Sequence, residues 1–169
     1  MNIREVSLSS PIEEKIAWAR ACYSEIKGSI RRDKEISGLL NRLERAITAS
    51  RREMAGTGIV EICRKCEEIE GGSCCGAGIE NRYDAKLLLI NLLINATLPV
   101  NRLDPESCFF LGKSGCLLKA RHVICVNYVC GKITDCIDPS NLAPLRQKEG
   151  EELEVLFLLH ERIGKVLSR

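Results

Sequence analysis

Cysteines are the residues of this sequence best suited to chemistry, and nine of the ten lie between residues 63 and 136. Cys63 and Cys66 form a Cys-x2-Cys pair, which the adjacent residues Cys74 and Cys75 follow. A pair of this kind lets two thiolates hold one ion from a tight turn, so further cysteines close behind it predict a metal site. A second group lies farther along the chain and consists of Cys108, Cys116, Cys125 and Cys130.

The identity and number of the metal centres stay open at this level. Eight thiolates can hold two zinc ions, one [4Fe–4S] cluster with four cysteines left over, or one of each, because zinc and iron–sulfur clusters both prefer thiolate ligands. Side chains of adjacent residues in an extended chain point in different directions. Cys74 and Cys75 therefore either bridge two centres or provide one ligand and one spare thiol.

Three further residues carry alternative roles. His122 and Cys136 are candidates for extra metal ligands. Nucleophilic catalysis by Cys125 with His122 as its base is a weaker hypothesis, since the chain has only two histidines. Cys22 lies outside the cysteine-rich segment, and we interpret it as a small buried hydrophobic residue.

The cysteine order resembles that of a known family. Cys63-x2-Cys66, Cys74-Cys75, Cys108-Phe-Phe-Leu-Gly…Gly115-Cys116-x-Leu and Arg121-x3-Cys125-x4-Cys130 together are similar to the CxxCxxCC family of zinc- or iron-chelating proteins, often called YkgJ-like. The resemblance spans residues 63–130 and implies that all eight cysteines bind zinc or iron. A related arrangement occurs in flagellin lysine methylases, which are thought to carry an iron–sulfur cluster and to transfer methyl from S-adenosylmethionine.

Two functions from different classes are consistent with these observations. The first is a metal-binding accessory or binding module, in which cysteine-held zinc or an iron–sulfur cluster staples the fold and the helices contact a protein partner. The second is an iron–sulfur redox or methyl-transfer enzyme that resembles flagellin lysine methylase. The first needs only what the sequence contains, whereas the second needs a cofactor pocket that no glycine-rich strand–turn–helix motif indicates.

Composition and charge limit the other classes of protein to which this chain could belong. The chain has 169 residues, 45% of them apolar, and a formal net charge of +2, which fits one domain and disfavours a nucleic-acid partner. The amino terminus lacks the pattern of a secretory signal, and the longest apolar stretch, Leu87 to Ile94, is too short to span a membrane. We therefore expect a cytoplasmic protein whose thiols stay reduced.

Hydrophobic periodicity predicts a mainly α fold around an irregular cysteine-rich metal-binding core. We divide a single domain, 1–169, into an N-terminal helical hairpin (1–57), a cysteine-rich zinc- or iron-chelating region (58–138) and a C-terminal helix (139–169). The hairpin is expected to comprise two antiparallel helices.

The expected helix boundaries follow from local signals. Ser10 as N-cap and Glu13 as its capping-box partner predict the start of the first helix, and the second is expected over about 34–54, stopping near Gly56 and Gly58. A third helix is expected over 82–95. The tail helix is expected over 151–167, after a loop over 141–150 that contains a proline.

Overall fold

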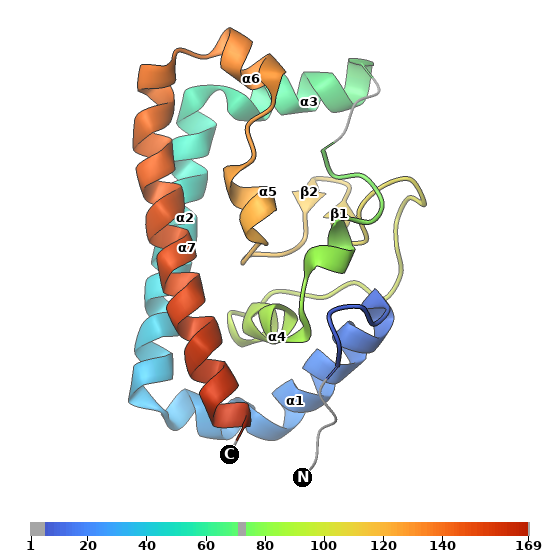
Figure 1. Ribbon diagram of the computed structural model, residues 1–169, viewed down its shortest axis with the longest axis vertical. Coiled ribbons are helices and arrows are strands. Elements are labelled where there is room, and N and C mark those ends of the chain that lie inside the picture. The colour runs from blue at the N-terminus through green and yellow to red at the C-terminus, as the bar shows by residue number, and fades with distance from the viewer. Residues whose placement is uncertain (1–5, 71–73, 169) are drawn as a thin grey trace.

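Long helices form a frame around a less regular interior. The computed structural model describes residues 6–70 and 74–168 and confirms a mainly helical fold. Helices α2 (Lys34–Thr57) and α7 (Pro139–Leu167) pack side by side and antiparallel, while α1 (Ile12–Arg32) crosses one end of this pair and α3 (Ile59–Glu70) leaves the other end (Figure 1).

The chain changes direction between α1 and α2 at Asp33. Its side chain accepts hydrogen bonds from the backbone N–H groups of Glu35, at 3.0 Å, and Ile36, at 3.1 Å, and so caps α2. The predicted capping box at the start of α1 is wrong, because Pro11 is the N-cap residue and makes no side-chain bond. Gly58 ends α2 in the left-handed conformation with φ of 85°, as its sequence predicts.

The expected hairpin of the first two helices is also wrong. Helix α1 packs mainly on α4 (Ala85–Leu93), whereas the extensive partner of α2 is α7. The cause is the composition of α4: Leu88, Leu89 and Ile90 are fully buried, so this helix needs apolar cover on several sides at once. The first helix supplies part of that cover and is therefore drawn away from the second.

Helix α7 is longer than local signals indicate, because residues 141–150 are helical and not a loop. The helix starts at Pro139, and the Asp138 side chain caps it by accepting from the backbone N–H of Ser140 at 2.8 Å. Pro144 lies inside the helix and removes one backbone hydrogen bond. Fully buried Leu145 follows it, and we infer that this burial offsets the lost bond.

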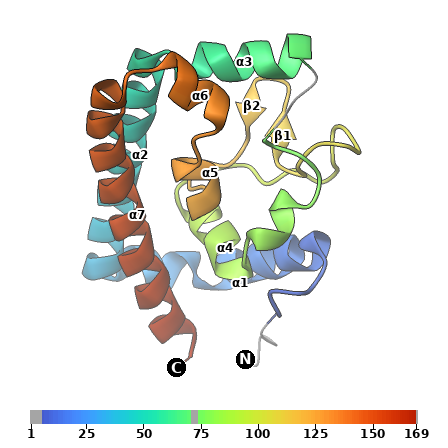
Figure 2. The same cartoon turned by 45° about the horizontal axis from the view of Figure 1, so that its top comes forward.

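Short elements fill the space inside the helical frame (Figure 2). A 3-10 turn, η1 (Ile79–Arg82), precedes α4, and a two-residue hairpin of β1 (Leu111–Gly112) and β2 (Gly115–Cys116) follows it. Two brief helices, α5 (Val123–Asn127) and α6 (Gly131–Cys136), then lead back to α7. The cysteine-rich region is therefore irregular only in part, since α3, α4, α5 and α6 all lie within it.

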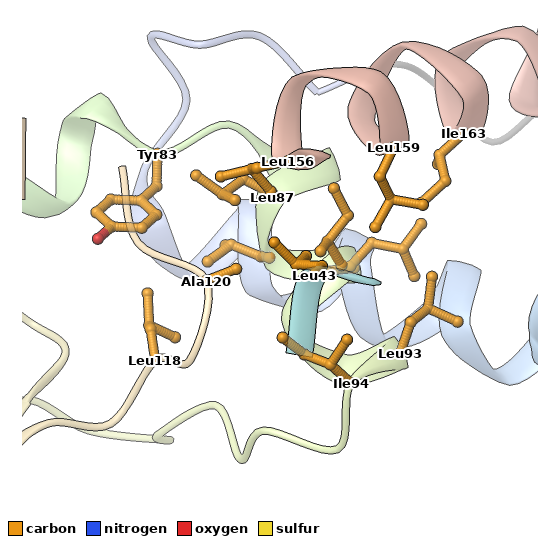
Figure 3. Close-up of a cluster of buried hydrophobic side chains, with 14 of the residues drawn as sticks. Leu43, Tyr83, Leu87, Leu93, Ile94, Leu118, Ala120, Leu156, Leu159 and Ile163 are labelled. Atoms are coloured by element: carbon orange, nitrogen blue, oxygen red, sulfur yellow. The ribbon is translucent and has the colours of Figure 1, made fainter. Parts of the chain in front are cut away.

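Two hydrophobic clusters hold these elements together. The main core gathers residues from α2, α4 and α7, such as Leu43, Leu87 and Leu159, together with Leu118 and Ala120 from the loop after β2 (Figure 3). A second core at the α3–α6 end of the molecule consists of Ile59, Ile133, Ile137 and Leu145. Among the described residues, no helix is both long and apolar enough to cross a membrane.

The main core yields a stability prediction on α7. Leu159→Ala removes a fully buried side chain, so we expect the free energy of unfolding to fall by about 2–5 kcal/mol. Phe157→Ala is the matched control, since Phe157 lies on the same helix with 63% of its surface exposed and should change stability little. Denaturant unfolding followed by circular dichroism measures both, and equal effects would contradict the assigned core face of α7.

Candidate metal centre

Helix α3 carries the Cys-x2-Cys pair. Cys63 and Cys66 are three residues apart on this helix, which places them on the same face, one turn apart. The expectation of a tight turn at this pair is therefore wrong. Cys63 is exposed and Cys66 is half-buried. Ile59 anchors the start of α3 in the second core, so the position of the pair depends on that core.

A short antiparallel contact brings Cys75 beside Cys108. The backbone N–H of Cys108 donates to the carbonyl oxygen of Cys75 at 2.6 Å, and Gly76 pairs with Ser107 as an isolated bridge. These two cysteines are separated by 32 intervening residues, so only the tertiary fold makes them neighbours. Residues 71–73, which precede Cys74, lie outside the described part of the chain.

A buried ion pair supports this contact. The Glu80 side chain is almost fully buried, accepts from the backbone N–H of Gly78 at 2.9 Å and pairs with Arg102. Arg102 also donates to the carbonyl oxygen of Ser107, next to Cys108. Burial opposes ionisation of Glu80, but the hydrogen bonds and the guanidinium prevail and hold its pKa below the ordinary value.

Asn91 fixes the loop after β2 to helix α4. Its amide nitrogen donates to the carbonyl oxygens of Leu87, at 3.0 Å, and Ala120, at 2.8 Å. Its amide oxygen accepts from the backbone N–H groups of Lys119, at 2.9 Å, and Ala120, at 3.0 Å. Asn91 is fully buried, so this one side chain satisfies three polar groups of the irregular loop and one of α4.

Tyr83 contacts Cys125. Its hydroxyl lies 3.6 Å from the sulfur of Cys125, to which it donates, and accepts from the backbone N–H of His122 at 3.1 Å. His122 in turn caps α5, because its Nδ1 accepts from the backbone N–H of Ile124 at 3.3 Å. That nitrogen therefore has a structural role at the helix start, and whether His122 is an extra ligand stays a prediction.

Helix α6 brings Cys130 toward α3. Cys130 is the N-cap residue of α6, and Lys132 on this helix donates from Nζ to the sulfur of Cys66 at 3.3 Å. Lys132 also forms an ion pair with Glu70 at the end of α3. Cys136 lies exposed at the other end of α6, and its role as an extra ligand stays a prediction.

Packing assigns five of the eight cysteines to two sets, and electrostatic neighbours assign Cys63, Cys66 and Cys74. Cys108 belongs to the main core, and Cys75, Cys116 and Cys125 pack against it. Cys130 instead packs against the second core, on the side of the molecule where α3 and α6 meet. We call Cys75, Cys108, Cys116 and Cys125 the inner set, and Cys63, Cys66, Cys74 and Cys130 the outer set.

The electrostatic neighbours of the thiols follow the same division. The pKa of Cys75 is raised to about 12, mainly by burial and with smaller contributions from the other three thiols of the inner set. Burial also raises the pKa of Cys63, with added contributions from Cys74, Cys130 and Cys66. Without a cation Cys63 and Cys75 therefore favour the neutral form, since a thiolate at either position would be poorly solvated and would be repelled by neighbouring thiolates.

A cavity of about 950 Å³ connects the two sets. Its wall includes apolar residues of α3 and α5, such as Val60 and Ile124, and the guanidinium of Arg121. The Nε atom of Arg121 is buried and has no hydrogen-bond partner among the described residues. Six of the eight cysteines line this cavity, namely Cys63, Cys74, Cys75, Cys108, Cys116 and Cys125.

The sulfurs are neighbours without forming a finished metal site. Within residues 6–70 and 74–168, no group of three or more His, Cys, Asp or Glu side chains is arranged so that it could hold a metal ion. The donor chemistry nevertheless fits zinc or an iron–sulfur cluster, because each set contains four thiols and both centres take four thiolate ligands. Sulfurs of one set would have to draw closer to bind an ion together.

Comparison with protein-family models, with curated proteins and with solved structures finds no match for this chain. The resemblance to the CxxCxxCC family therefore remains a prediction from the cysteine order.

Sequence reasoning placed Cys22 correctly, since it is fully buried in the main core. It missed the side chains that hold the cysteine segments in place. Asn91, Glu80 and Tyr83 carry no spacing signal, because their partners lie far away in the sequence. An amide inside the apolar run 87–94 was the one available clue, since a buried polar group requires partners.

Substitution of Asn91 tests how the loop after β2, which leads from Cys116 to Cys125, is held in place. Asn91→Ala leaves backbone groups of Lys119 and Ala120 buried without partners, so we expect a loss on the order of 3 kcal/mol in the free energy of unfolding. Exposed Asn141→Ala is the matched control and should cost little. Denaturant unfolding measures both, and a small loss for Asn91→Ala would show that the loop after β2 does not depend on it.

Proposed function

We propose that this protein binds a thiophilic metal through the inner and outer sets and acts as a metal-stapled accessory or binding module. The observation that carries the proposal is that cysteines far apart in the sequence lie close together in the fold. Six cysteines from separate stretches of chain line one cavity, and the other two, Cys66 and Cys130, are electrostatic neighbours of Cys63.

Metal binding would supply cross-links between cysteine segments that have little regular secondary structure. The β hairpin has two residues in each strand, and α5 and α6 have five and six residues, so regular hydrogen bonding provides little stability there. Thiolates that share one cation would tie these segments together, and binding of the metal would release protons from the thiols. The free energy of binding would then be part of the free energy of folding.

The donor sets support zinc and a [4Fe–4S] cluster equally, because all eight candidates are thiols. The alternative function, an iron–sulfur redox or methyl-transfer enzyme, draws support from the cavity. A volume of about 950 Å³ with an apolar wall beside the thiols is within the range of small-molecule sites. Elemental analysis of anaerobically purified protein separates these cases, since iron with acid-labile sulfide favours the enzyme and colourless zinc favours the module.

Chelation gives a test of the stapling role. After a strong chelator removes the metal, we expect faster amide hydrogen exchange in residues 74–76, 107–116 and 122–130, because these segments lose their cross-link. The paired helices α2 and α7 provide the internal control, since they are held by buried apolar contacts and should keep their protection. Hydrogen exchange read by mass spectrometry measures both parts in one sample.

Two outcomes would contradict the proposal. Protein that holds neither zinc nor iron, after anaerobic purification from cells supplied with both metals, would refute metal binding itself. Bound metal whose removal leaves exchange unchanged in the cysteine segments would refute the stapling role while leaving metal binding intact.

A further inference from the structure

The inner set occupies one wall of the main core. Cys75 and Cys108 are joined by a backbone hydrogen bond, and the hydroxyl of Tyr83 reaches Cys125 at 3.6 Å. The register of the β hairpin places Cys116 opposite Leu111. Leu111 follows Cys108 by a few residues, so the hairpin brings Cys116 back toward Cys108. All four thiols are buried or half-buried, and they pack against residues of the same hydrophobic cluster.

Three members of the outer set lie on α3 or at the start of α6, and the fourth, Cys74, has Cys130 and Cys66 as electrostatic neighbours. The contact between these helices is fixed by the second core, which includes Ile59 at the start of α3 and Ile133 in α6. Lys132 reinforces it through Cys66 and Glu70, both on α3. This set is more accessible than the inner one, because Cys63 and Cys74 are exposed.

Each set has its own positive charge. Four thiolates around a divalent ion leave a net negative charge, which a nearby cation can offset. In the outer set this cation is Lys132, whose Nζ lies 3.3 Å from the sulfur of Cys66. In the inner set Arg121 and, more weakly, Arg51 act on Cys116, and Arg121 lines the cavity with a buried Nε that has no hydrogen-bond partner among the described residues.

We propose that the eight cysteines form two separate four-thiolate metal centres, an inner one of Cys75, Cys108, Cys116 and Cys125 and an outer one of Cys63, Cys66, Cys74 and Cys130. The proposal rests on the proposed function. The adjacent pair Cys74–Cys75 then supplies one ligand to each centre, which resolves the awkward geometry of two neighbouring thiols on one ion. Because the outer centre is more exposed, it releases its metal to a chelator before the inner centre does.

The metal content of single and double Cys→Ser variants tests which cysteines share a centre. Cys66→Ser and Cys125→Ser should each lose the metal of one centre and keep that of the other. Cys63→Ser combined with Cys66→Ser, both in the outer set, should lose no more than Cys66→Ser alone. Cys66→Ser combined with Cys125→Ser should lose all metal, and Cys136→Ser, outside both sets, should lose none.

A second experiment uses the wild-type protein and does not depend on whether a variant folds. Metal is removed by a chelator under anaerobic conditions while samples are treated with an alkylating reagent and mapped by mass spectrometry. We expect two phases of metal release. Alkylation should reach the four outer cysteines in the first phase and the four inner cysteines only in the second, with exposed Cys136 labelled throughout as the internal standard.

The outcomes separate the two levels of the proposal. Protein that holds no metal refutes the proposed function, and with it the two centres. Bound metal that is lost completely on Cys66→Ser or on Cys125→Ser alone, or release in one phase with inner and outer cysteines alkylated together, refutes the two-centre assignment while metal binding stands. Labelling of Cys74 and Cys75 in the same phase would refute the division of that pair.

Discussion

The antiparallel contact between α2 and α7 is the constraint on which the rest of the structure depends. Because the two helices run in opposite directions, the chain that leaves α2 at Gly58 and the chain that enters α7 at Asp138 lie at the same end of the pair. Helices α3 and α6, which carry Cys63, Cys66 and Cys130, are attached at that end and so must meet. Ion pairs from Arg162 on α7 to the start of α2 close the opposite end.

Inside this frame, buried polar contacts take the place of regular secondary structure. The loops that carry the inner cysteines have few backbone hydrogen bonds of their own, so their polar groups need other partners. Asn91 and the Glu80–Arg102 pair supply such partners and fix the loops on either side of the β hairpin. These contacts bring the thiols together, but among the described residues no three candidate ligands are arranged so that they could hold a metal ion.

The chemistry of the thiols explains why two sets are more reasonable than one large cluster. Thiolate charges repel, and burial raises the cost of each charge, so an efficient site gathers only the ligands that one centre can use. Zinc and a [4Fe–4S] cluster both use four. The inner four cysteines pack in or against the main core, the outer four are electrostatic neighbours of one another, and a separate basic side chain accompanies each set.

The sequence by itself determined the helical class, the stop of α2 at Gly58, the burial of Cys22 and the choice of cysteine as the candidate ligand, because each depends on local conformation or on residue type. It did not determine that α1 turns away from α2, that residues 141–150 are helical despite Pro144, or that Cys63 and Cys66 lie on a helix. Those features are decided by which apolar faces can be buried together. The different neighbours of adjacent Cys74 and Cys75 are likewise tertiary, because Cys130 influences the first whereas Cys108, Cys116 and Cys125, all far along the chain, influence the second.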